Sequence, residues 1–158
     1  MDKVLFSTGN DDWETPFNLF EQLHKEFDFT IDVAASETNH KLPRYYTKDT
    51  DGLAQNWAGE RVFCNPPYSR KTKTNPGQAA WIEKAYKESL RGALVVLLIP
   101  ARTDTKAFHD YILPYAKIRF LPGRLRFEVD GVPKDGAPFP SMVVIFDGRS
   151  EQPGGVTL

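Results

Sequence analysis

Residues 93–99, Ala-Leu-Val-Val-Leu-Leu-Ile, are seven apolar residues in a row. A strand with one exposed face alternates apolar and polar side chains, whereas an uninterrupted apolar run indicates a strand covered on both faces. Such strands occur inside largely parallel sheets that carry helices on both sides. The run is also far shorter than the about 20 residues of a membrane-spanning helix. It therefore predicts an α/β protein with residues 93–99 as a central strand.

Shorter patterns before and after this run complete the predicted fold. Thr15-Pro16 is typical of a helix cap followed by the first helical residue, and Asn75-Pro76 predicts a second helix that reaches about residue 90. Further strands are predicted at residues 29–33, 61–64, 117–121, 125–129 and 141–146, with a hairpin turn at Asp130-Gly131. We expect a mostly parallel sheet with an antiparallel C-terminal strand or hairpin. We also expect one domain over residues 1–158, with an ordered core at about 13–147.

The strand at residues 61–64 ends in Asn65-Pro66-Pro67-Tyr68. Two consecutive prolines stiffen the backbone and cannot continue a strand ladder. In open α/β sheets, ligands bind outside the carboxyl ends of the strands, so an amide and an aromatic ring held there suit a flat polar ligand. The alternative is that the prolines only terminate the strand. The four residues together, at a strand end, favour a functional site.

Several familiar catalytic signatures are absent from the sequence. It contains neither a phosphate-binding P-loop nor the glycine-rich dinucleotide fingerprint, and its three histidines lack metal-ligand spacing. Cys64, the single cysteine, ends an apolar strand and is expected to be a buried structural thiol. What remains is a group transfer that needs neither a protein nucleophile nor a metal. The lone cysteine and the lack of an apolar N-terminal run lead us to expect a cytoplasmic protein.

Charge is distributed unevenly along the chain. The whole chain carries −1, but residues 65–126 hold 12 basic and 4 acidic residues, a net charge of +8. Such asymmetry indicates contact with nucleic acid, although part of it belongs to the solvated face of the second predicted helix. The candidate phosphate contacts are the basic residues in loops or near strand ends: Arg70, Lys71, Lys73, Arg102, Arg124 and Arg126.

Asp32 stands near the end of the strand predicted at residues 29–33, and small residues follow it as Ala34-Ala35-Ser36. A strand-end carboxylate can accept hydrogen bonds from the hydroxyl or amine groups of a nucleoside, and small residues allow close approach. The alternative is that Asp32 caps a turn, a common use of aspartate.

The motifs occur in an order that resembles a known family. Trp13-Glu14-Thr15-Pro16, the strand end at residues 31–35, Phe63-Cys64-Asn65-Pro66-Pro67-Tyr68-Ser69 and residues 120–127 together resemble the compact, phage-type Dam family of DNA N6-adenine methyltransferases. The resemblance covers roughly residues 13–146. It implies a Rossmann-like methyltransferase sandwich, S-adenosylmethionine as cofactor, double-stranded DNA as substrate, and no metal.

The resemblance also assigns residues to the cofactor. Trp13, Thr15 and Pro16 should lie near the methyl donor, and Asp32 stands where the first cofactor-binding motif ends. The broader superfamily has a glycine-rich turn at that point, and this chain has Ala34-Ala35-Ser36 instead. Asp51, or alternatively Asp49, would supply a second acidic contact.

The implied chemistry concerns an amine. The exocyclic amine of adenine is a poor nucleophile because its lone pair is delocalised into the ring. The Asn65 side-chain oxygen and the Pro66 carbonyl can accept both amine hydrogens, with Pro67 completing the stiff turn, and this favours the reactive form electrostatically. Tyr68 would stack on the base, which must first leave the double helix. Sequence specificity would come from loops, such as residues 69–76 and 122–140.

Two other functional classes are compatible with these residues. An amino-methyltransferase acting on RNA or on a protein glutamine amide would use the same motif. A non-catalytic nucleic-acid-binding module with a decayed site is the second class. The +8 segment favours nucleic acid over protein, and the intact Asn65-Pro66-Pro67-Tyr68 motif favours catalysis.

Overall fold

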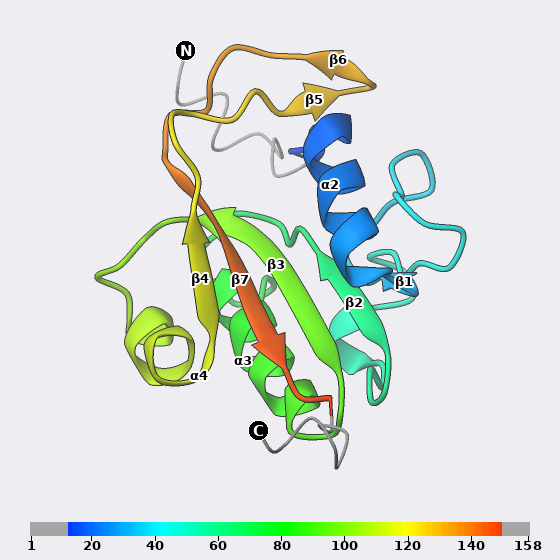
Figure 1. Ribbon diagram of the computed structural model, residues 1–158, viewed down its shortest axis with the longest axis vertical. Coiled ribbons are helices and arrows are strands. Elements are labelled where there is room, and N and C mark those ends of the chain that lie inside the picture. The colour runs from blue at the N-terminus through cyan, green and yellow to red at the C-terminus, as the bar shows by residue number, and fades with distance from the viewer. Residues whose placement is uncertain (1–12, 150–158) are drawn as a thin grey trace.

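Strand β3 (Leu94–Pro100) runs through the middle of the sheet, as the apolar run predicts. The computed structural model of the protein describes residues 13–149 (Figure 1). All seven residues of β3 are buried. The predicted central strand is therefore confirmed, and it includes Pro100, which we had not assigned to it.

Four further strands complete the main sheet: β1 (Ile31–Asp32), β2 (Arg61–Cys64), β4 (Lys117–Phe120) and β7 (Ser141–Asp147). Their order is β1-β2-β3-β7-β4. β1, β2 and β3 pair in parallel, and β7 lies antiparallel to both β3 and β4. Four of the five strands thus run in one direction. The predicted mixed sheet with an antiparallel C-terminal strand is confirmed.

Helices cover both faces of this sheet (Figure 1). α2 (Phe17–Phe27) packs on one face, while α3 (Gln78–Ser89) and the π-helical segment η2 (Phe108–Ile112) pack on the other. A short helix, α4 (Leu113–Tyr115), continues η2. Alternate residues of β3 enter the two cores, with Val96 facing α2 and Val95 facing α3. This two-sided burial is the reason that the β3 sequence is apolar throughout.

The predicted helix starts are wrong by one residue for α2 and by two residues for α3. Pro16, rather than Thr15, is the N-cap of α2, and the Thr15 hydroxyl accepts a hydrogen bond from Asn65 instead. Gly77, rather than Asn75, is the N-cap of α3. Asn75 Oδ1 accepts a hydrogen bond from the Gly77 N–H at 2.9 Å, so it closes the turn just before the helix.

The remaining elements are short. The strand predicted at residues 29–33 is limited to Ile31–Asp32, and a 3-10 turn, η1 (Gly52–Ala54), follows it in the chain. β5 (Glu128–Val129) and β6 (Val132–Pro133) form the predicted antiparallel hairpin. Asp130 and Gly131 both have positive φ, 53° and 78°, as a two-residue hairpin turn requires. The hairpin prediction is confirmed.

Across residues 13–149, no helix is both long and apolar enough to cross a membrane. The two ends of the predicted domain, residues 1–12 and 150–158, lie outside the described part of the chain.

Candidate active site

The three parallel strands β1, β2 and β3 end at one edge of the sheet, which is where the motif residues gather. Asp32 is the last residue of β1, Asn65 directly follows β2, and Pro100 is the last residue of β3. This is the edge at which open α/β sheets bind their ligands.

The side-chain amide of Asn65 is held from one side only. Its Nδ2 donates to the Trp13 carbonyl oxygen and, at 3.0 Å, to the Thr15 hydroxyl. Its Oδ1 is buried, and no residue within 13–149 donates a hydrogen bond to it. A buried acceptor without a partner costs free energy and calls for an explanation. Because its nitrogen is occupied by two acceptors, the oxygen is the atom of this amide that remains able to accept a hydrogen bond.

The segment that holds Asn65 is itself attached to the β5–β6 hairpin. Backbone hydrogen bonds join Glu14 to Glu128 in both directions, at 3.1 and 3.0 Å. The Glu14 carboxylate also accepts from the Asp130 and Gly131 N–H groups at the hairpin turn, at 3.0 and 3.2 Å. The neighbouring Thr15 hydroxyl, which accepts from Asn65, is therefore positioned by residues that lie more than a hundred positions later in the chain.

Tyr68 stands at the junction of the two cores, because its ring packs against both. Its hydroxyl donates to the Leu98 carbonyl at 2.9 Å. Burial raises the pKa of Tyr68 well above its ordinary value, so the phenol stays protonated. On the α2 side, its ring meets Phe127 and Phe139 edge-on, with centroids 5.9 and 5.5 Å away. Stacking of Tyr68 on a base stays a prediction.

Asp32 is 4% exposed, and both carboxylate oxygens already accept backbone hydrogen bonds. The Ala34 N–H donates to Oδ1 at 3.4 Å, and the Lys41 N–H donates to Oδ2 at 2.9 Å. Burial raises the pKa of Asp32 to about 6, against the opposing effect of these two N–H groups. This geometry fits the turn-forming alternative, in which Asp32 fixes the loop after β1. A contact between Asp32 and a cofactor stays a prediction.

The other residues predicted to contact the cofactor lie in three different segments. Trp13, Thr15 and Pro16 lie in the segment that holds Asn65, and Ala34 is half-buried just beyond β1. Asp51 is exposed on the turn before η1 and has a left-handed backbone, with φ of 55°. Within residues 13–149, no hydrogen bond joins Asp51 to the Asn65 network. Among the described residues, hydrogen bonds therefore join Trp13 and Thr15 to Asn65, and none joins Ala34 or Asp51 to it.

The contacts of Cys64 and of two histidines indicate structural roles for these residues. Cys64 is fully buried, and burial raises the pKa of its thiol well above the ordinary value, which disfavours a nucleophilic thiolate. His24 Nδ1 accepts from the Phe29 N–H at 3.1 Å, and His40 stacks on Tyr45. In the described part of the chain, no three potential metal-ligating side chains cluster together.

Comparison with known protein families identifies the chain. The sequence model of the DNA N-6-adenine-methyltransferase (Dam) family matches residues 4–156, nearly the whole length. The chain belongs to the Dam family. It is 28% identical over 121 residues to the DNA N-6-adenine-methyltransferase of Escherichia phage T1, covering 75% of this chain and 48% of that protein. It is also 28% identical over 149 residues to the DNA N-6-adenine-methyltransferase of Haemophilus phage HP1, covering 90% and 82%. The chain thus spans about half the length of the T1 relative.

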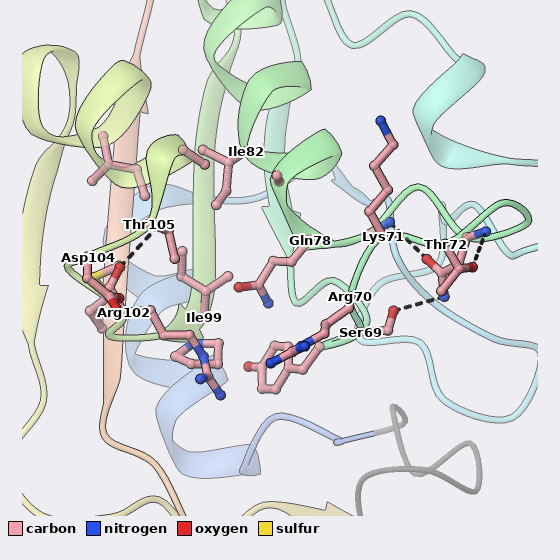
Figure 2. Close-up of a pocket in the computed structure, with 18 residues that line it drawn as sticks. Ser69, Arg70, Lys71, Thr72, Gln78, Ile82, Ile99, Arg102, Asp104 and Thr105 are labelled. Carbon is pink, nitrogen blue, oxygen red and sulfur yellow. Dashed lines mark hydrogen bonds between the residues drawn. The ribbon is translucent and has the colours of Figure 1, made fainter.

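The basic residues of this Dam-family chain fall into two sets. Arg70, Lys71 and Arg102 line one cavity, shown in Figure 2, whereas Lys73, Arg124 and Arg126 are exposed outside its lining. None of these six cations forms an ion pair with a carboxylate in the described residues. Eight other lysines and arginines there do: Arg44, Arg61, Lys84, Lys87, Arg91, Lys106, Arg119 and Arg149. The six predicted contacts are therefore electrostatically available to phosphates.

Sequence reasoning missed two aromatic residues of the site. Phe127 and Phe139 surround the Tyr68 ring, and Trp13 packs edge-on against both at 5.4 and 5.6 Å. Phe127 ends one of the motifs that carry the Dam resemblance, which was the available signal. Phe139 lies between two prolines in an irregular segment, where no periodic pattern marks it.

Proposed function

We propose that this chain transfers a methyl group from S-adenosylmethionine to the N6 amine of adenine in double-stranded DNA. The observation that carries the proposal is the buried, unpartnered Oδ1 of Asn65, at the carboxyl edge of the sheet. Membership of the Dam family and the names of the two phage relatives support adenine in DNA as the substrate.

Asn65 and Pro66 would orient the amine. The Asn65 oxygen accepts one amine hydrogen and the Pro66 carbonyl accepts the other, which favours the form whose lone pair is available. The amine nitrogen would then bond to the methyl carbon as the methyl–sulfur bond of the cofactor breaks, with the thioether as leaving group, and one amine proton would pass to water. Because Trp13 and Thr15 already hold the Asn65 nitrogen, the amide keeps its orientation when the base arrives.

The target adenine has to leave the DNA stack before its amine can reach Asn65. Tyr68 would stack on the extruded base. Its ring is held at the hydroxyl by Leu98 and at its edge by Phe127 and Phe139, so it offers a rigid surface. Arg70, Lys71, Lys73, Arg102, Arg124 and Arg126 would contact phosphates and supply the salt-dependent part of the affinity.

The side chains at the carboxyl edge of the sheet are chemically suited to bind the cofactor. The aromatic ring of Trp13, the small side chain of Ala34 and the carboxylate of Asp32 are the kinds of group that hold a nucleoside, with Thr15 and Pro16 next to Trp13 and Asp51 as a more distant candidate. When bound, the cofactor supplies an electrophilic methyl group. We extend the proposal to the fold, as a compact Rossmann-like methyltransferase sandwich, and to action in the cytoplasm of a bacterial host.

One experiment tests the substrate. The protein is incubated with methyl-labelled S-adenosylmethionine and with DNA, RNA or protein as acceptor, and the modified group is identified by mass spectrometry. N6-methyladenine in DNA is the expected product. Label that enters only RNA or only protein would overturn the proposal.

A second experiment tests the role of Asn65. Asn65→Ala should lower methyl transfer by about 100- to 1,000-fold, the usual effect of removing one oriented catalytic group. DNA binding should be retained, because Asn65 is not among the proposed phosphate contacts. Asn18→Ala, at an exposed position of α2, is the matched control and should keep its activity. An Asn65→Ala variant with unchanged transfer would refute this role.

A further inference from the structure

A cavity of about 880 Å³ lies beside the motif, between the loop that follows β2, the first turn of α3 and the segment that follows β3 (Figure 2). Its lining includes Tyr68, Arg70, Gln78, Ile99 and Arg102. The volume lies within the range of about 300–1,000 Å³ that is typical of small-molecule sites.

This cavity is separate from the place where the amine would be methylated. Neither Asn65 nor the Trp13–Pro16 segment lines it, and Asp32 does not either. Tyr68 does line it, and the same ring packs against both cores. Tyr68 therefore stands between the cavity and the aromatic residues Phe127 and Phe139 on the α2 side. The cavity and the amine site are neighbours that share one ring.

The charge of the cavity wall favours an anion. Arg70, Lys71 and Arg102 line it with one acidic residue, Asp104, and within residues 13–149 none of the three cations has a carboxylate within ion-pair distance. Unpaired guanidinium groups suit phosphate oxygens, which they bind with charge-assisted hydrogen bonds. S-Adenosylmethionine has a sulfonium and an ammonium group against one carboxylate, so its net charge is positive and a wall of three cations is poorly suited to it.

The inner surface of the cavity suits a nucleobase. The side chains of Ile82, Ile99 and Met142 in the cavity lining are apolar, and the Gln78 side chain extends between Ile82 and Ile99 (Figure 2). The Gln78 Nε2 is buried, and it has no hydrogen-bond acceptor among the described residues. Glutamine amides commonly recognise the edges of bases through paired hydrogen bonds. A base in the cavity would both satisfy this amide and cover the apolar wall.

We propose that this cavity holds a nucleotide adjacent to the methylated adenine, with its phosphate at Arg70 and Arg102 and its base read by Gln78. The inference rests on the proposed DNA methyltransferase activity and deepens it, because it assigns part of the sequence specificity to a site outside the amine-binding edge. Tyr68 would then separate two nucleotides, the target on its α2 side and the neighbour on its α3 side.

The test uses a library of duplexes in which the positions next to a target adenine are randomised. Methylation rates are read for each neighbouring base in the wild type, in Gln78→Leu and in the control Gln22→Leu, which changes an exposed glutamine of α2. Binding of labelled S-adenosylmethionine is measured without DNA. Gln78→Leu should lose a base preference of about tenfold or more at one neighbouring position. Its cofactor affinity should stay within about twofold, and Gln22→Leu should behave as the wild type.

A second variant tests the inference even if Gln78→Leu does not fold. Arg102→Gln, at the exposed rim, should weaken DNA binding for all sequences and reduce the salt dependence by about one phosphate contact. Unchanged base preference in Gln78→Leu, a loss of cofactor affinity in that variant, or unchanged DNA affinity in Arg102→Gln would each overturn the inference. If the wild type methylated no adenine in DNA, the proposed function itself would fail, and that outcome is read separately in the same assay.

Discussion

Asp32 gives the sharpest physical prediction, because its carboxyl group is buried without a cation in hydrogen-bond contact. Burial raises its pKa from 3.8 to about 6. Below about pH 4 the group is neutral in both the folded and the unfolded chain. As the pH rises toward 6, the unfolded chain loses this proton first, and the folded chain must then either keep the proton or bury a charge. The folded state is therefore destabilised progressively between about pH 4 and pH 7.

The size of this effect follows from the shift. A difference of about two pKa units corresponds to about 3 kcal/mol at 1.36 kcal/mol per unit. Asp32→Asn removes the titration and should therefore gain stability relative to the wild type as the pH rises. Asparagine cannot accept through its amide nitrogen, so one of the two hydrogen bonds, from the Ala34 or the Lys41 N–H, is lost at every pH. That loss shifts the whole difference curve and leaves its slope unchanged.

Urea unfolding at a series of pH values from 4 to 7.5 measures the slope. The difference between Asp32→Asn and wild type should rise by about 2–3 kcal/mol across this range. Asp51→Asn, which removes an exposed carboxylate, serves as control and should stay within about 0.5 kcal/mol throughout. A flat difference for Asp32→Asn, or one that falls with rising pH, would refute the reasoning from burial.

Two further predictions concern the segment between β1 and β2. Glu88 is 4% exposed and accepts a hydrogen bond from the Trp57 N–H at 2.6 Å. Because Glu88→Ala breaks this buried charged network, it should lower the free energy of unfolding in urea by about 3–5 kcal/mol. Glu83→Ala, which removes an exposed ion pair on the same helix, should change stability by less than about 1 kcal/mol, and an equal effect of the two would contradict the reasoning. A Cβ on Gly52 would lie 2.1 Å from the Val33 carbonyl oxygen, so Gly52→Ala should displace the end of β1. The substitution should lower the unfolding free energy by about 1–3 kcal/mol. It should also weaken S-adenosylmethionine binding in a calorimetric titration. A cofactor affinity equal to that of the wild type would show that this segment does not contribute to the cofactor site.

Local patterns were enough to predict most of the sheet. The apolar run of β3, the strand that ends at Asn65, and the Asp130-Gly131 turn each depend on residues that are adjacent in the chain. Their structure follows from side-chain burial on a pleated strand and from the positive φ of a two-residue turn. Such signals survive in a single sequence because no distant partner is needed to interpret them.

Features that depend on distant partners were predicted less well. Thr15 is a residue type that often caps helices, but its hydroxyl accepts a hydrogen bond from Asn65, 50 residues later. Both Asp32 oxygens accept hydrogen bonds from backbone N–H groups, one of them nine residues away, which the place of Asp32 at a strand end did not predict. Phe139 reaches Tyr68 from an irregular segment. In each case the competing partner is fixed by tertiary structure, which propensity and periodicity do not encode.

The hydrogen bonds between Glu14 and the hairpin turn have a consequence for any exchange of the hairpin between relatives. The two N–H groups of the turn bind a carboxylate 116 and 117 residues earlier in the chain, and the residues on either side of that carboxylate hold Asn65. A hairpin transplanted from a relative keeps these bonds only if its turn places two N–H groups at the same position, because the Glu14 carboxylate binds the backbone of the turn. A turn of different length would release Glu14 and loosen its neighbours Trp13 and Thr15, which hold Asn65. The hairpin and residues 13–16 thus form one structural unit, although they are far apart in the gene.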